Sequence, residues 1–193
     1  MNLEGTFFLK HQAKTDVILS LQKEVNYSSF FETGTFKGKM LSSLEKHFTY
    51  LYSIELSKKF FEETRIKFVN SPSVSLFLGD TTRVLPLILK RLKTPVFFWL
   101  DAHYWPNSPF AIGDQMCPIR EELSCISKHE LVESHIILID DFRCFLGKYD
   151  YPTQDELLQL IHTLFPKHRV IVKDDIVRII PLFIYKQESF NFL

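Results

Sequence analysis

Acidic side chains close or follow five short apolar segments of this 193-residue chain. They are Glu32, Glu55, Asp80, Asp101 and Asp140. A single case is ordinary, because Asp and Glu commonly cap the helix that follows a strand. Five in succession indicate a shared role, since the carboxyl ends of parallel strands lie along one edge of a sheet, where open α/β proteins bind their ligands. We therefore expect these carboxylates to meet in one crevice.

The first of these acids belongs to a glycine-containing stretch, SFFETGTFKG at residues 29–38. It predicts a buried strand, a turn at Gly34 and a helix that opens at Gly38. Glycine at the turn lets the backbone approach a ligand, and the second glycine is expected to let the helix pack against the strand. The spacing lacks the first glycine of the dinucleotide fingerprint. It also puts Glu32 where a pyrophosphate would lie, so a cationic or amino-bearing ligand suits the site better.

The position of Glu55 predicts a nucleoside in the same crevice. Glu55 lies 21 residues after Gly34 (55 minus 34) and closes the second predicted strand. In nucleotide-binding α/β folds an acidic residue at about this distance hydrogen-bonds the ribose hydroxyls.

The elements that must position these residues alternate along the chain. The expected strands are 29–33, 50–55, 74–78, 95–100 and 136–139. The expected helices are 38–47, 57–69, 81–92 with Thr81 or Thr82 as its cap, 118–129 and 154–165. Two further strands, 169–173 and 176–180, are joined by a tight turn at Asp174 and Asp175 and predict an antiparallel hairpin. This alternation predicts a single doubly wound α/β domain over 1–193, with a helical extension at 1–27 and an insertion at 102–134.

Composition and charge narrow the partners. The chain has 23 Lys and Arg against 23 Asp and Glu, which gives no electrostatic argument for nucleic acid or an anionic membrane. No apolar run is long enough to span a bilayer. Cys117, Cys125 and Cys144 contain no Cys-x-x-Cys pair, which is typical of reduced thiols in a cytoplasmic protein. We expect no nucleic-acid or membrane partner, and a homodimer stays open.

The ordered motifs resemble those of class I S-adenosylmethionine-dependent methyltransferases over roughly residues 28–182. The resemblance rests on Glu32-x-Gly34-x-x-x-Gly38, on Glu55 at the end of the second strand, and on Gly79-Asp80 followed by Leu85-Pro86. It implies a Rossmann-like, seven-stranded, mostly parallel sheet with a C-terminal antiparallel hairpin.

The same resemblance implies the cofactor and the residues that hold it. Glu32, Gly34, Thr35 and Gly38 would lie near the methionine portion of S-adenosylmethionine, and Asp101 would face it. Glu55 would bind the ribose and Asp80 the adenine amino group. This cofactor carries a sulfonium and an ammonium but no phosphate, which agrees with the charge at Glu32.

Carboxylates after the fourth and fifth strands predict a metal site. Asp101 and the pair Asp140 and Asp141 would be neighbours, and like charges this close raise one another's pKa unless a cation neutralises them. The arrangement is similar to metal-dependent small-molecule O-methyltransferases of the catechol and macrolide-sugar types, which implies Mg²⁺ bound by these three residues. The alternative, that Asp140 and Asp141 only cap a turn and bind solvent, stays open.

The residues after Asp101 supply candidates for catalysis. His103 is the first candidate for the general base, because its ordinary pKa lies near physiological pH, and Tyr104 is the second. Asp101 completes this catalytic set. One interpretation is that six loop residues form an aromatic acceptor pocket: Tyr104, Trp105, Phe110, Phe142, Arg143 and Phe145. The alternative is that the aromatic residues among them pack under the loops, and that Arg143 binds an acidic group of the acceptor or forms a surface salt bridge.

The sequence thus predicts methyl transfer to a hydroxyl of a small molecule, with magnesium assistance left open. Two alternatives remain: a nicotinamide-dependent oxidoreductase on a similar sheet, and a non-catalytic binding domain that retains the fold.

Overall fold

A computed structural model describes residues 10–104 and 113–185, and within them seven strands form one sheet. The strand order is β3-β2-β1-β4-β5-β7-β6, and only β7 runs against the others. The strands are β1 (Ser29–Thr33), β2 (Tyr50–Glu55), β3 (Val74–Leu78), β4 (Val96–Leu100), β5 (Ile136–Ile139), β6 (His168–Lys173) and β7 (Ile176–Pro181). The predicted doubly wound α/β fold with its antiparallel hairpin is confirmed.

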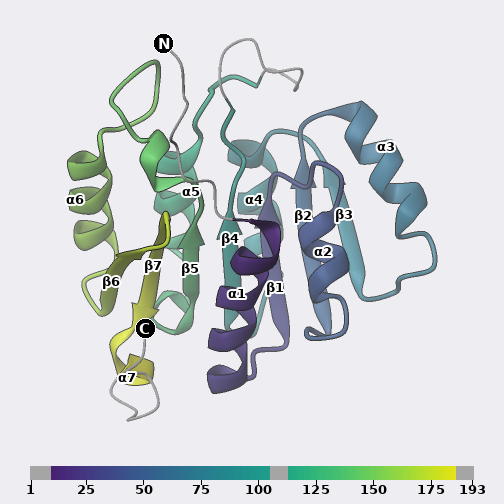
Figure 1. The fold of residues 1–193 in the computed structure, drawn as a ribbon, viewed down its shortest axis with the longest axis horizontal. Coiled ribbons are helices and arrows are strands. Elements are labelled where there is room, and N and C mark those ends of the chain that lie inside the picture. Colours follow the sequence, from purple (N-terminus) through teal and green to yellow (C-terminus); the bar gives the residue numbers. More distant parts are fainter. Residues whose placement is uncertain (1–9, 105–112, 186–193) are drawn as a thin grey trace.

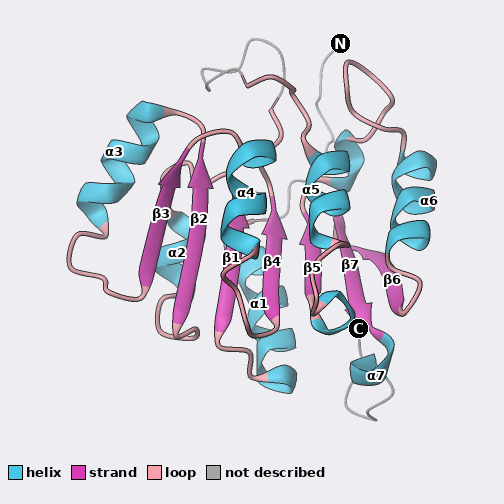
Figure 2. Ribbon diagram, turned by 180° about the vertical axis from the view of Figure 1, so that it is seen from behind, coloured by secondary structure: helices cyan, strands magenta, loops and turns pink. Residues whose placement is uncertain are grey.

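Helices cover both faces of the sheet (Figures 1 and 2). One face packs against α1 (His11–Val25), α2 (Lys39–Leu44) and the end of α3 (Lys58–Lys67). The other packs against α4 (Thr81–Leu89), α5 (Ile119–Ile126) and α6 (Gln154–Leu164). Short helices, η1 (Val132–Ser134), η2 (Phe142–Cys144) and α7 (Leu182–Tyr185), complete the described chain. No described helix combines the length and the apolar character that a bilayer crossing requires.

The central strands are buried on both faces, and β4 and β5 are apolar at every position, whereas β1 also buries Ser29, Glu32 and Thr33. All residues of β1, β4 and β5 are buried, which is the pattern expected for inner strands of a parallel sheet. β1 and β4 pair in register, with Glu32 opposite Trp99 and Thr33 opposite Leu100. The strand order reverses between them, so the ends of β1 and β4 frame the point where such folds bind ligands.

The C-terminal hairpin follows from its turn. Asp174 and Asp175 both adopt left-handed backbone conformations, with φ of 54° and 62°. Two successive residues of this kind match the twist of a two-residue hairpin loop, and Asp tolerates the conformation better than most residues do.

Two details of the sequence prediction are corrected. The cap of α4 is Asp80, whose carboxylate accepts the backbone N–H of Thr82, and neither Thr81 nor Thr82 has this role. Gly38 faces α3 instead of a strand, since a Cβ there would lie 2.7 Å from Cε2 of Phe68. This glycine therefore serves helix–helix packing.

Candidate functional site

A cavity of about 290 Å³ opens at the carboxyl end of β1 and β4. Its lining includes the carboxylates of Glu32, Asp101 and Asp140, of which Glu32 and Asp140 are buried. Its other side carries cationic or cation-capable groups. These are His11 and Lys14 from α1 and the exposed Lys37 and Lys39 at the start of α2. The cavity thus offers carboxylates and basic groups to one ligand.

Glu32 is held by a chain of hydroxyl groups. Its Oε2 accepts a hydrogen bond from Ser53 Oγ at 2.8 Å, and Ser53 Oγ lies 2.6 Å from Thr35 Oγ1. All three side chains are buried. Burial raises the pKa of Glu32 well above its ordinary value, and the negative charge of Asp101 raises it further. A cationic ligand in the cavity would reverse this effect, because it favours the ionised carboxylate.

Gly34 lets the first turn pass directly over the end of β4. Its φ is +87°, and a Cβ at this position would lie 2.4 Å from the carbonyl oxygen of Asp101. The glycine was predicted to let the backbone approach a ligand. In the structure it lets the turn after β1 approach the backbone at Asp101, and this contact holds the ends of β1 and β4 close together.

Glu55 and Asp80 lie at the same edge but do not line this cavity. Glu55 accepts the backbone N–H groups of Phe36 and Ser57, each at 2.7 Å. Asp80 accepts the N–H of Thr82 at 2.8 Å, and that of Asp114 approaches its other oxygen at 3.4 Å. The expected single crevice is therefore divided: Glu32 and Asp101 face the cavity, while Glu55 and Asp80 are engaged by loop backbone.

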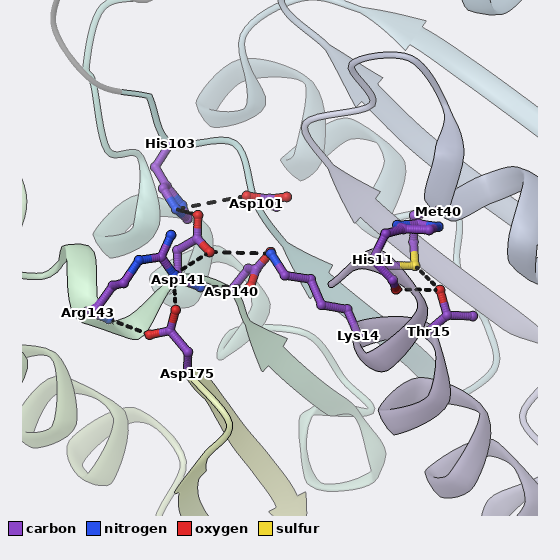
Figure 3. Close-up of polar contacts among 10 residues, drawn as sticks. All are labelled: His11, Lys14, Thr15, Met40, Asp101, His103, Asp140, Asp141, Arg143 and Asp175. Atoms are coloured by element: carbon purple, nitrogen blue, oxygen red, sulfur yellow. Dashed lines mark hydrogen bonds and ion pairs between the residues drawn. The ribbon is translucent and has the colours of Figure 1, made fainter. Parts of the chain in front are cut away.

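His103 stands between two carboxylates beyond the end of β4 (Figure 3). Its side chain is 6% exposed, and its Nε2 lies 3.9 Å from Asp101 Oδ1 and 3.8 Å from Asp141 Oδ2. These distances are too long for hydrogen bonds, and Nε2 has no hydrogen-bond partner among the described residues. Burial lowers the pKa of His103, but Asp141, Asp101 and Asp140 raise it by more, so the net shift is upward.

Asp140 and Asp141 are engaged by basic side chains. Lys14 Nζ bonds Asp140 Oδ2 and lies 3.3 Å from Asp141 Oδ1. Arg143 donates to that same oxygen of Asp141 at 2.9 Å and also pairs with Asp175. Burial raises the pKa of Asp141, but His103, Lys14 and Arg143 outweigh this and lower it.

The predicted magnesium ligands do not fit one cation in this arrangement. Asp140 Oδ1 accepts the N–H of Asp141 at 2.8 Å, and Oδ2 holds the Lys14 ammonium. The donor atoms that converge, within 4.8 Å of one another, come instead from Asp101, His103 and Asp141. Magnesium binding by Asp101, Asp140 and Asp141 therefore stays a prediction.

The second candidate base is less suited to its role. The Tyr104 side chain is buried, and burial raises the pKa of its hydroxyl. Its backbone N–H donates to the Met116 carbonyl at 3.0 Å, and its carbonyl accepts the hydroxyl of Tyr151 at 3.2 Å. Phe142 and Phe145 pack in or against the core, which favours the interpretation that these aromatic residues pack under the loops. Trp105 and Phe110 lie outside the described residues.

Sequence reasoning missed Lys14. It lies four residues before Ile18 and seven before Leu21, on the stripe of α1 that packs against the sheet. The spacing predicts an apolar side chain at position 14. The lysine found there was the available signal that this position has a role other than core packing.

Comparison with known proteins agrees with the fold. No protein-family model matches the chain, and no curated protein matches it in sequence. Among solved structures, the methyltransferase PaMTH1 of Podospora anserina, bound to S-adenosylhomocysteine, is 15% identical, with a TM-score of 0.63 over 90% of this chain and 80% of that one. The O-methyltransferase TomG of Streptomyces achromogenes, solved with S-adenosylmethionine, is 15% identical, with a TM-score of 0.60 over 90% and 82%. The N-methyltransferase NodS of Bradyrhizobium japonicum is 12% identical, with a TM-score of 0.57 over 88% and 95%.

These similarities establish the fold of class I S-adenosylmethionine-dependent methyltransferases, as the resemblance in sequence implied. By their names, TomG is an O-methyltransferase and NodS is an N-methyltransferase. The shared fold therefore leaves the acceptor atom to be argued from the site.

Proposed function

We propose that this chain binds S-adenosylmethionine at the carboxyl edge of its sheet and transfers the methyl group to a hydroxyl group of a small molecule. The observation that carries the proposal is the cavity between β1 and β4. Burial raises the pKa values of its carboxylates, Glu32 and Asp101, and a positively charged ligand would offset this effect by stabilising their ionised forms. The exposed Lys37 and Lys39, which also line the cavity, suit a carboxylate. The α-amino acid end of S-adenosylmethionine, with its ammonium, its carboxylate and the sulfonium nearby, has this distribution of charge.

Glu55 and Asp80 extend the proposed site toward β2 and β3. Each oxygen of Glu55 accepts one backbone N–H and retains a lone pair that a ribose hydroxyl could use. Asp80 is covered by the segment at residues 113–114, because a Cβ on Gly113 would lie 3.0 Å from Asp80 Oδ2 and 3.1 Å from Leu56 Cδ2. An adenine that reaches Asp80 would therefore displace this segment.

The cluster around His103 suits the removal of a proton from a hydroxyl. When bound, S-adenosylmethionine supplies a methyl group on a sulfonium, which leaves as a neutral thioether. His103 Nε2 has no hydrogen-bond partner among the described residues, and in this proposal it takes the proton of the substrate hydroxyl as the oxygen–methyl bond forms. Asp101 and Asp141 stabilise the imidazolium that results, since both lie within 4 Å of Nε2. Asp101, at the end of β4, links this base to the cavity.

The magnesium-assisted form of the reaction receives less support from the site. Its implied ligands are engaged by Lys14, Arg143 and a backbone N–H. If turnover of the purified enzyme ceases in EDTA and returns with Mg²⁺, the metal-assisted form is correct. We expect no loss.

The two alternatives predict different binding. A nicotinamide-dependent oxidoreductase would place a pyrophosphate beside Glu32, whose ionised form repels it. A non-catalytic binding domain would keep its biological activity in Asp101→Ala and Glu55→Ala variants, whereas we expect both variants to lose it.

Calorimetric titration tests the proposal. We expect saturable binding of S-adenosylmethionine and none of NAD. Glu32→Gln should weaken binding by roughly tenfold or more, because it replaces a charge-assisted hydrogen bond with a neutral one. Glu24→Gln, an exposed change on α1, is the matched control and should bind like the wild type. Saturable binding of NAD alone would end the methyltransferase proposal.

A further inference from the structure

The ammonium group of Lys14 occupies the place between Asp140 and Asp141 where a bridging cation would be expected (Figure 3). It bonds Asp140 Oδ2, lies 3.3 Å from Asp141 Oδ1, and its side chain is 19% exposed. Asp140 itself is 1% exposed. A buried carboxylate needs a partner, and here an element more than a hundred residues away in sequence supplies it.

The position of Lys14 is fixed by the docking of α1. Ile18 and Leu21 have no exposed surface and pack in one cluster with Phe30 of β1 and Leu138 of β5. At the start of the helix, His11 Nε2 lies 3.0 Å from Ser43 Oγ of α2. The lysine therefore extends from a helix that is docked on the sheet toward the end of β5.

Basic groups of the chain itself contact the carboxylates at this edge. The carboxylates are Asp101, Asp140 and Asp141. Lys14 faces the last two, Arg143 donates to Asp141 at 2.9 Å, and His103 lies between Asp101 and Asp141. A divalent ion at Asp140 would meet an ammonium already in place, and like charges at such distances repel strongly.

We propose that Lys14 is the resident cation of this edge and takes the place of the divalent metal that the acidic pair would otherwise bind. It is a positioning residue: it holds Asp140 and Asp141 in place beside His103. Its part in methyl transfer rests on the proposed function, but cation binding can be measured without turnover. Failure of one idea is therefore distinguishable from failure of the other.

The test is titration of the full chain with Mn²⁺, followed by electron paramagnetic resonance of the free ion. We expect no saturable binding to the wild type below about 1 mM, the weak end of known carboxylate sites. Lys14→Met should bind Mn²⁺ roughly tenfold more tightly or better, because a repelling charge is removed. Lys14→Arg, which keeps the charge, and Lys23→Met, an exposed change on the same helix, should behave like the wild type.

The double variant that combines Lys14→Met with Asp140→Asn should lose the tighter Mn²⁺ binding expected of Lys14→Met alone. Thermal melts of every variant confirm folding, and Lys14→Gln replaces Lys14→Met if the latter unfolds. Saturable Mn²⁺ binding to the wild type overturns the inference. So does a Lys14→Met variant that binds no better than the wild type, or gained binding that survives Asp140→Asn.

Discussion

At the scale of single residues, the hydrogen-bond donor that each carboxylate accepts indicates its role. Glu55 and Asp80 accept backbone N–H groups and so fix the loops that follow β1 and β3. Among the residues that the structure describes, Glu32 accepts a hydrogen bond from the Ser53 hydroxyl alone, and it faces the cavity. Since a charge-assisted hydrogen bond from a ligand would be stronger than this one, Glu32 has the most to gain from a bound cation.

Replacing Gly34 with alanine should abolish ligand binding and also lower the free energy of unfolding. The new Cβ would collide with the Asp101 carbonyl, and the backbone would be held at φ +87°. We expect a loss of roughly 1–3 kcal/mol in the free energy of unfolding from the strain alone. Urea denaturation measures this loss, and calorimetry measures binding of S-adenosylhomocysteine.

Gly147→Ala is the matched control for this strain. It also has a positive φ, +67°, but its Cβ would meet the side chain of Thr153 instead of the site. It should lose stability and keep binding. Unchanged binding by Gly34→Ala would refute the role given to the close approach at Asp101.

Buried Glu122 should make the protein less stable as the pH rises. Burial raises its pKa from 4.5 to about 7, and Asp80 adds to the shift, while hydrogen bonds from Thr81 and Thr33 and the charge of His103 oppose it. A carboxyl with a raised folded pKa binds its proton more tightly in the native state. Its contribution is therefore complete below about pH 4.5 and is lost as the pH rises through 7, by about 3 kcal/mol in all.

Urea midpoints of the wild type and Glu122→Gln at pH 5 and pH 8 measure this effect. The variant should gain stability relative to the wild type at pH 8, and Glu121→Gln, an exposed neighbour, should not. An equal difference between wild type and Glu122→Gln at both pH values would contradict the prediction.

At the scale of elements, α1 belongs both to the core and to the site. Its residue Ile18 is fully buried against the sheet, and its residue Lys14, on the same face of the helix, reaches the end of β5. Few sequence features mark this double role. The apolar spacing predicted the helix, but the surface on which it docks is set by tertiary packing.

Ile18→Ala should destabilise the protein by roughly 2–5 kcal/mol, the usual cost of a cavity left by a large buried side chain. Ile66→Ala on α3, where the side chain is 67% exposed, should cost less than about 0.5 kcal/mol. Denaturant unfolding compares the two variants. Equal losses would mean that α1 does not dock as described.

At the scale of the whole molecule, the sequence predicted what depends on local pattern. The apolar runs 96–100 and 136–139 lie between helical segments and were predicted as buried inner strands. Each is followed by an acid, which led to the expectation that these acids share one edge of the sheet. The turn at Asp174 and Asp175 predicted the hairpin for the same local reason. The prediction was wrong where two local signals competed, as at Asp80, which caps α4 in preference to Thr81 or Thr82.

What the sequence did not reveal depends on contacts between distant segments. Lys14 meets Asp140 across 126 positions, and Gly38 meets Phe68, the C-cap of α3, across 30. The cover over Asp80 depends on the path of the segment at 113–114. The helical spacing of α1 singles out Lys14 but not its partner, because each of these contacts results from how complete elements pack.

The most direct test of the central claim is a crystal structure of the chain with S-adenosylhomocysteine. The proposal predicts that the amino group of the ligand lies within hydrogen-bond distance of the Glu32 carboxylate. It also predicts that the sulfur points toward Asp101 and His103, and that residues 113–114 move away from Asp80. A ligand bound elsewhere, or no bound ligand at saturating concentration, would contradict it.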